Sequence, residues 1–133
     1  MEIELLTIGE LCKDTAEYCA TKLCREGSEM QAEFREGKSD TPVVVICVGE
    51  PVAWVASHEW RGQQTLEAFV AEDRRRCGLA SIGAMVLLST SYLNRKQPLA
   101  VFSPDCIPLA RSLGFRDVYN YTRNGNDWIL HLG

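Results

Sequence analysis

Residues 43–48, with the sequence Val-Val-Val-Ile-Cys-Val, restrict the fold of this chain more than any other segment. An unbroken apolar run that is mostly β-branched is typical of a strand covered on both faces. Gly49-Glu50-Pro51 supplies a turn after it, and residues 52–60 and 65–71 have the composition of two further strands. We therefore expect a three-stranded antiparallel meander.

Helical and extended patterns alternate around this meander. Residues 1–8 can form a short strand, and apolar or small residues recur at helical spacing over residues 9–26. Residues 27–42 carry both signs of charge and contain Gly37 and Ser39. This composition favours a mobile surface connection, and it leaves room for a short second helix.

The second half of the chain continues the alternation. The pattern predicts a helix over residues 78–94, a strand over 98–103 and a short helix that Asp105 caps and Gly114 ends. Two strand-like segments then flank Asn124-Gly125, a pair suited to a two-residue hairpin turn. This order predicts a mixed α/β sheet with helices covering its faces.

Composition excludes several classes of protein. The chain has 133 residues, of which 46% are hydrophobic and 24% charged, as in one globular domain. The net charge of -4 gives no general basic field for nucleic acid, although a local basic site is compatible with it. No run approaches the roughly 20 apolar residues of a membrane span. The acidic start, Met1-Glu2-Ile3-Glu4, is unlike a secretory signal, so we expect a cytoplasmic protein.

The six cysteines do not form a recognisable framework. There is no Cys-x-x-Cys pair, and His58 and His131 show no metal-ligand spacing. We expect reduced cysteines that pack as small hydrophobic residues, and no metal. A redox or metal protein is the alternative, which metal analysis of the purified protein would test.

The segment with most chemical content is residues 66–80, in which a strand leads through a basic turn into a helix. Unpaired amides at a helix N-terminus and the helix dipole together attract anions. Gly78 and Ala80 leave room for a ligand near the backbone, and Arg74, Arg75 and Arg76 supply charge. A pyrophosphate-like group would suit this turn, but a solvated basic turn explains the same residues. The segment is neither a P-loop nor a dinucleotide fingerprint.

The same turn carries a family resemblance. Residues 75–80, Arg-Arg-Cys-Gly-Leu-Ala, match the Arg/Gln-x-x-Gly-x-Gly/Ala signature of the GNAT superfamily of acyl-CoA N-acyltransferases. Val70 stands five residues earlier, and Leu113-Gly114-Phe115 is similar to the family's Leu-Gly-Phe. The resemblance covers essentially the whole chain. It implies one domain over residues 1–133, with a mostly antiparallel twisted sheet of six to seven strands and three to four helices.

The resemblance also implies a place for acetyl-CoA, in the opening where the fourth strand parts from the fifth. Amides near Phe69 and Val70 would hold the pantetheine and polarise the thioester, and Ser103 could contact the coenzyme or the thiolate. An amine on a small molecule or a protein would attack the thioester directly, without a metal. Homodimers are common in the family. The pyrophosphate would bind to the turn formed by Arg75, Arg76, Cys77, Gly78, Leu79 and Ala80.

The chain departs from the family at the acid and base positions. Ala110 stands where many relatives carry a proton-donating tyrosine, and Gln64 stands where several carry a glutamate. An amide cannot accept the proton of the amine. Strand alternation places Glu67 on the face opposite Leu66 and Val70, which weakens its case. The candidates nearby are His58, Glu59, Glu67 and Glu72, of which we take His58 and Glu72 as the catalytic residues.

Two function classes follow. The first is an N-acetyltransferase that modifies a primary amine, with residues 27–42 and 123–126 as rims of the acceptor site. The acidic residues of the first rim would suit a cationic amine, and a solvated charged face explains them as well. The second is a catalytically impaired GNAT-fold interaction or structural protein, including a phage-related one. Trp54 and Trp60 could then form an aromatic partner surface.

Overall fold

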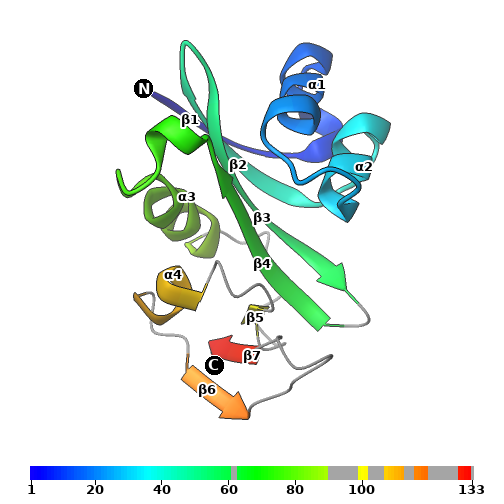
Figure 1. Ribbon diagram of the computed structural model, residues 1–133. Helices are drawn as coiled ribbons and strands as arrows, with labels where there is room; N and C mark the ends of the chain where they lie inside the picture. The colour runs from blue at the N-terminus through cyan, green and yellow to red at the C-terminus, as the bar shows by residue number, and fades with distance from the viewer. Residues whose placement is uncertain (61–62, 90–98, 102–106, 113–115, 120–128, 133) are drawn as a thin grey trace.

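The computed structural model describes residues 1–60, 63–89, 99–101, 107–112, 116–119 and 129–132 (Figure 1). The chain alternates between strands and short helices throughout these residues. In chain order the elements are β1 (Glu2–Thr7), the 3-10 helix η1 (Ile8–Glu10), α1 (Lys13–Lys22), α2 (Glu29–Glu36), β2 (Pro42–Val48), β3 (Glu50–Trp60), β4 (Gln63–Val70), the 3-10 helix η2 (Glu72–Arg74), α3 (Leu79–Leu88), β5 (Leu99–Val101), α4 (Ile107–Ser112), β6 (Arg116–Tyr119) and β7 (Ile129–Leu132).

All the strands belong to one sheet. Its order is β1-β2-β3-β4-β5-β7-β6, and every neighbouring pair is antiparallel except β4 and β5. The β2-β3-β4 meander that the sequence predicted is confirmed, with β2 buried on both faces over residues 43–46. The expected fold class, a mixed and mostly antiparallel sheet covered by helices, is confirmed as well.

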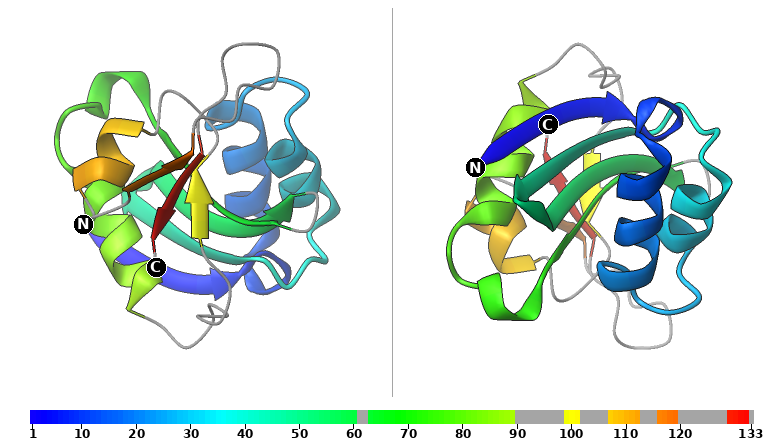
Figure 2. Two further views of the ribbon diagram at one scale, coloured as in Figure 1. Left: turned by 90° about the horizontal axis from the view of Figure 1, so that it is seen from below. Right: turned by 90° about the horizontal axis from the view of Figure 1, so that it is seen from above.

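Helices cover both faces of the sheet (Figure 2). On one face, α1 and α2 pack against Val43, Val45 and Trp54. On the other, α3 packs against Val44, Ile46 and Val55. The alternation of side chains along β2 therefore divides the core into two layers.

The connection over residues 27–42 is ordered, so our expectation of a mobile surface segment is wrong. It contains α2, which buries Met30 and Phe34 against the sheet. Gln31 ties α2 to α1: its Nε2 donates to the Ala20 carbonyl at 2.9 Å, and its Oε1 accepts from Gly27 N–H at 2.8 Å. These bonds satisfy a buried amide and fix the turn between the two helices.

Helix α3 lies very close to the sheet. A Cβ atom built on Gly83 would stand 2.7 Å from Val55 Cγ2 and 3.5 Å from Ile46 Cδ1. Only glycine allows this approach, because real Cβ contacts do not come so close. The helix begins after Gly78, whose φ of 77° is in the left-handed region.

The C-terminal predictions are tested in part. Strands β6 and β7 pair antiparallel as expected, but the predicted Asn124-Gly125 turn lies outside the described residues. The helix predicted over residues 78–94 ends at Leu88, with residues 90–94 outside the described part. Asp105 and Gly114, the expected cap and stop of α4, also lie outside it.

Candidate functional site

Within the described residues, strand β4 has a neighbour on its outer edge at one position only. It pairs with β3 over its whole length, from Gln63 to Val70, but with β5 only at Thr65↔Ala100. Figure 1 shows β5 beside the beginning of β4 only. Among the residues that the structure describes, the outer edge of β4 is therefore unpaired towards its C-terminal end.

The register shows which backbone groups line this open edge. Ala71 N–H donates to the Val52 carbonyl at 2.8 Å, so its neighbour two residues back, Phe69, also exchanges hydrogen bonds with β3. Ala68 and Val70 alternate with these residues and direct their N–H and C=O groups away from β3. The Phe69 amide, which we expected at the site, thus belongs to the β3–β4 ladder. Ala68 and Val70 present donors and acceptors to which an extended ligand could add like a strand.

Beside this edge, the turn from β4 to α3 exposes amides. Gly78 is the N-cap of α3 and its carbonyl accepts from Ile82 N–H at 3.0 Å, so the N–H groups of Leu79, Ala80 and Ser81 precede the first helical donor. Within the described residues, no hydrogen bond reaches these three groups. A side chain at Gly78 would meet nothing within 4 Å. The turn thus holds three backbone donors without a partner in the described part of the chain, at the position where the sequence predicts an anion site.

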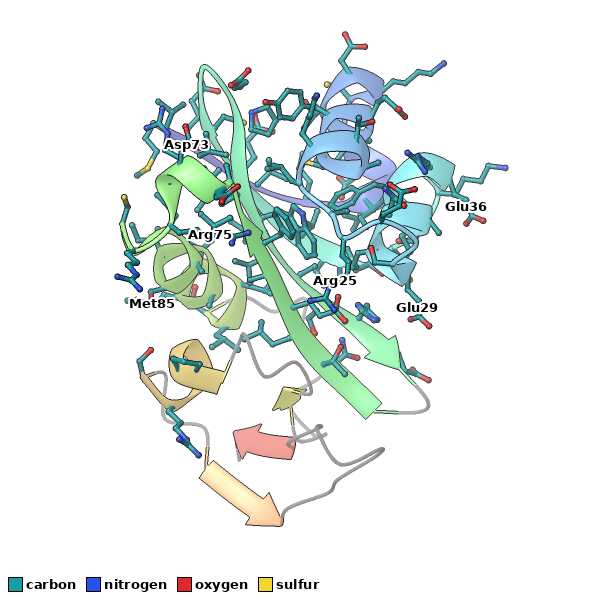
Figure 3. All side chains as sticks on the ribbon, in the orientation of Figure 1. Arg25, Glu29, Glu36, Asp73, Arg75 and Met85 are labelled. Atoms are coloured by element: carbon teal, nitrogen blue, oxygen red, sulfur yellow. The ribbon has the colours of Figure 1, made fainter. Side chains whose placement is uncertain are left out.

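Arg75 reaches from this turn to the edge of β4 (Figure 3). Its Nε donates to the Val70 carbonyl at 3.1 Å, and its guanidinium lies 5.6 Å from the centroid of the Phe69 ring. Arg75, Arg76 and Cys77 are all exposed. One acceptor of the open edge is thus covered by an exposed side chain that belongs to the turn itself.

A second group of polar residues lies on the α1/α2 face. His58 of β3 is only 5% exposed, and its Nε2 lies 3.6 Å from Glu29 Oε2 and 3.5 Å from Glu67 Oε1. Neither ring nitrogen has a hydrogen bond within the described residues. Glu29 comes from α2 and Glu67 from β4, so three elements bring this cluster together.

The surroundings of Glu67 shift its ionisation. Burial raises the pKa of its carboxyl above the ordinary value. His58 opposes this effect and lowers the pKa, the carboxylates of Glu29 and Glu33 raise it, and Arg25 lowers it. The net direction is upward, because desolvation penalises the charged form.

The two predicted catalytic residues stand at opposite ends of the β3–β4 pair. His58 lies opposite Thr65, whereas Glu72 is exposed and follows the end of β4. Glu72 comes seven positions after Thr65 in a mostly extended stretch, which corresponds to roughly 20 Å. The structure therefore does not bring His58 and Glu72 into one site.

Glu67 is the residue that sequence reasoning set aside. Alternation correctly places it on the face opposite Leu66, but that is the face on which His58 lies. In the sequence, Glu29 is one of several acidic residues in segment 27–42, and nothing local distinguishes it from the others. The sequence carried one signal for this site. His58 and Trp54 are four residues apart on one strand and therefore share a face, and Trp54 packs under α1 and α2.

The other predicted residues fall in several places. Gln64 donates from Nε2 to Ser57 Oγ at 2.6 Å, and Glu59 is exposed. Ala110 lies in α4, and Ser103 lies outside the described residues. Trp54 is buried and donates from Nε1 to the Leu23 carbonyl at 2.6 Å, so its proposed role in a partner surface is wrong. The side chain of Trp60 lies outside the described part.

Five of the six cysteines lie within the described residues. The five cysteines found there are free, and burial raises the pKa of the Cys19 and Cys24 thiols to about 12. In this part of the chain, no cluster of His, Cys, Asp and Glu side chains is arranged to hold a metal ion. No helix within it has the length and apolarity needed to cross a bilayer.

Comparison with known proteins identifies the architecture. No family model and no curated protein sequence matches the chain. Solved structures do match: ElaA from Escherichia coli superposes with a TM-score of 0.70 at 16% identity, covering 99% of each chain. An acyl-CoA N-acyltransferase from Pseudomonas aeruginosa gives a TM-score of 0.64 at 14% identity, again over 99% of each chain. This chain has the GNAT fold.

A further GNAT-fold match is yncA from Salmonella typhimurium, solved with its cofactor acetyl-CoA. Its TM-score is 0.63 at 13% identity, covering 98% of this chain and 90% of yncA. At such identities the likeness concerns the fold, and the fold does not fix the reaction. The fold expected from the sequence resemblance is confirmed.

Proposed function

We propose that this GNAT-fold protein is an N-acetyltransferase that uses acetyl-CoA to acetylate a primary amine of a small molecule or a protein. The observation that carries the proposal is the open edge of β4 ending at a turn with unpaired amides. An extended arm with a diphosphate at one end requires both features side by side. The fold shared with acyl-CoA N-acyltransferases supports the same assignment.

In this proposal the diphosphate lies over the turn of residues 75–80. The N–H groups of Leu79 and Ala80 would donate to phosphate oxygens, and the open space at Gly78 would admit them. Arg76 and Cys77 complete the loop around the phosphates, and Ala68 and Val70 would pair with the pantetheine amides.

Arg75 has to release the Val70 carbonyl before a ligand can pair with it. An exposed hydrogen bond contributes about 1 kcal/mol and an exposed cation–π contact about 0.5–1 kcal/mol, so the release is inexpensive. The freed guanidinium is then available to the diphosphate, with which it makes a charge-assisted bond. Coenzyme binding would thus exchange one contact of Arg75 for another.

Acetyl-CoA supplies an activated thioester, and the chain has to orient the amine and accept its proton. His58 is the proposed proton acceptor, reached through Glu67, which lies on the same strand as the open edge. Glu72 would act near the diphosphate end, because it follows the end of β4. Ala110 supplies no acid, and general acid catalysis typically contributes about 10²–10⁴-fold, so its absence slows the reaction without preventing it.

A catalytically silent GNAT-fold interaction protein is the second candidate. The contact of Arg75 with Val70 and the alanine at position 110 favour it, because the first occupies the coenzyme edge and the second removes the usual acid. The absence of heat in titrations of the wild-type protein with millimolar acetyl-CoA would favour this candidate over the transferase.

The coenzyme site is tested by calorimetric titration of Gly78→Glu and Gly78→Gln with acetyl-CoA. The two variants share the backbone strain at φ 77° and have nearly equal volume, so their difference isolates the charge. One negative charge about 6 Å from a doubly charged diphosphate, at an effective dielectric constant of about 40, costs about 3 kcal/mol. We expect Gly78→Glu to bind roughly 100-fold more weakly than Gly78→Gln. Equal affinities would place the diphosphate elsewhere.

A further inference from the structure

Strand β1 is the outermost strand at its end of the sheet (Figure 2). Within the described residues, no strand pairs with its outer edge. Ile8 N–H, just beyond β1, donates to the Thr41 carbonyl at 3.0 Å, whereas Thr7 lies opposite Pro42, which has no N–H to donate. Hydrogen-bonded and non-hydrogen-bonded pairs alternate along an antiparallel ladder. The even-numbered residues of β1 therefore bond to β2, and the odd-numbered ones direct their N–H and C=O groups outward.

Two residues of this outer edge can accept a further strand. The N–H of Thr7 is already bonded, because Glu10 Oε1 accepts from it at 3.0 Å. The outward groups of Ile3 and Leu5 have no hydrogen-bond partner in the part of the chain that the structure describes. An extended peptide laid along β1 could therefore exchange backbone hydrogen bonds with Ile3 and Leu5, in the way that peptides add a strand to an exposed sheet edge.

One face of this edge is apolar. Leu5 packs into the core under α3, so Ile3 and Met1, which alternate with it, face the same side. Val48 shares that face with the buried Ile46 and stands beside the start of β1. Met1, Ile3 and Val48 are 69%, 38% and 40% exposed, and they are three of the four exposed large apolar side chains of the described residues. Apolar side chains gathered in this way are typical of a contact surface, whereas scattered single ones are not.

The other face of the edge is acidic. Burial raises the pKa of the Cys47 thiol, and the carboxylates of Glu4 and Glu2 raise it further. Both carboxylates thus lie near Cys47, which faces the α1/α2 layer. Glu2 and Glu4 are exposed, and within the described residues neither side chain takes part in an ion pair or a hydrogen bond. A strand laid along β1 would therefore meet negative charge on one of its faces and apolar side chains on the other.

We propose that the outer edge of β1 binds an extended segment of a protein partner, as an added strand in which basic side chains alternate with apolar ones. Successive side chains of a strand point to opposite faces, so alternation brings the basic residues beside Glu2 and Glu4 and the apolar ones beside Met1 and Ile3. Opposite charges on neighbouring strands stabilise the pairing. Because β2 and β3 separate this edge from β4, the inference does not depend on the proposed transferase activity.

A second copy of this chain suits the edge less well. Antiparallel pairing of two β1 strands through Ile3 and Leu5 would put Glu4 directly opposite the same residue of the other copy. Like charges directly opposite each other destabilise a sheet. Charged residues on an edge strand oppose self-association, and here the same charges would select a basic segment.

Nuclear magnetic resonance titration of the full chain with a synthetic hexapeptide tests the proposal. The peptide is Lys-Val-Lys-Val-Lys-Val, acetylated and amidated at its ends. Binding should slow hydrogen exchange of the Ile3 and Leu5 amides by roughly tenfold or more, and it should leave the Glu4 amide, which already bonds to β2, unchanged. The control peptide Lys-Lys-Lys-Val-Val-Val has the same charge and composition without the alternation. It should bind about fivefold more weakly, because its charges do not gather on one face.

Variants of β1 test its side chains and its backbone separately. Glu2→Gln and Glu4→Gln together should weaken binding of the alternating peptide about fivefold. Glu36→Gln is the matched control, because it removes an exposed carboxylate from α2 and should change nothing. Ile3→Pro removes an outward N–H only, a change that an edge strand tolerates, and should weaken binding about fivefold. If Ile3→Pro does not fold, the glutamine variants and the exchange of the Ile3 and Leu5 amides decide.

Several results would overturn the proposal. Failure of the alternating peptide to bind would do so, and so would unchanged exchange at Ile3 and Leu5 in its presence. Equal affinities for the two peptides would show that attraction between charges, without an added strand, holds them. Sedimentation of the protein alone addresses the other occupant: a dimer that Ile3→Pro converts to monomers would assign the edge to a second copy of the chain.

Discussion

Replacing Gly83 by alanine tests the seating of α3, the helix that presents the turn amides. In an exposed helix interior, alanine is about 1 kcal/mol more favourable than glycine. At position 83 the new Cβ would stand 2.7 Å from Val55 Cγ2, about 1 Å inside the best separation of two carbon atoms. We therefore expect the usual gain from alanine to be reversed.

The magnitude follows from two opposing effects. Overpacking in a well-packed core costs typically 1–3 kcal/mol, and the helix preference returns about 1 kcal/mol. Gly83→Ala should therefore lower the free energy of unfolding by about 1 kcal/mol, which for a domain of this size corresponds to a fall in Tm of roughly 3–6 °C. A helix displaced from the sheet would also shift the turn of residues 75–80 and weaken acetyl-CoA binding.

Urea and thermal unfolding, followed by circular dichroism, measure the effect. The matched control introduces Gly83→Ala into a Val55→Ala background, where the clashing methyl groups are absent and the same substitution should be neutral or stabilising. If Gly83→Ala raises the Tm of the otherwise wild-type protein, then α3 does not approach β3 as closely as the structure indicates.

Three further predictions concern the face of the sheet that α1 and α2 cover. A carboxyl whose pKa is raised on folding stabilises the protein below its unfolded pKa, and this contribution is lost as the pH rises through the folded pKa. Because the pKa of Glu67 is raised, Glu67→Gln should raise the Tm at pH 7 but not near pH 4. A lower Tm at pH 7 would contradict the raised pKa. Gln31→Leu removes the hydrogen bonds to Ala20 and Gly27 and should lower the free energy of unfolding, measured by urea denaturation, by about 2–3 kcal/mol. A loss below about 0.5 kcal/mol would show that these two bonds do not hold the helix pair together. His58→Ala should lower kcat/KM for acetyl transfer by about 10²–10⁴-fold and leave the affinity for acetyl-CoA unchanged, and an unchanged kcat/KM would exclude His58 from the proton path.

Much of the fold could be predicted because local patterns and tertiary structure agree. The β-branched run at residues 43–48 is a strand buried on both faces, and Gly78 does begin a helix after the basic turn. Helix α2 was predicted only as an alternative, because charged residues of both signs dominate its segment and make its apolar spacing hard to recognise. Ser28 accepts from Gln31 N–H as an N-cap, Gly37 ends the helix at φ 65°, and Met30 and Phe34 are spaced to meet on one face.

The cluster of Glu29, His58 and Glu67 could not be predicted from the sequence, for a geometric reason. Which residue of β4 stands near His58 depends on the register of β3 and β4, and a shift of one residue would move Glu67 to the other face. Glu29 comes from a helix that is distant in sequence, so no local pattern relates it to His58. Local patterns could show the turn amides, whereas sites built from several elements required the pairing.

The hydrogen bonds of Gln31 have a consequence for the free energy with which an acceptor could bind on this face. Glu29 belongs to α2, and the hydrogen bonds of Gln31 already hold α2 against α1 before a ligand binds. Ordering a loose loop would consume part of the binding energy, at about 0.5–1.5 kcal/mol for each immobilised side chain. A braced rim avoids much of that loss, so even a small amine with few contacts could be held long enough to react.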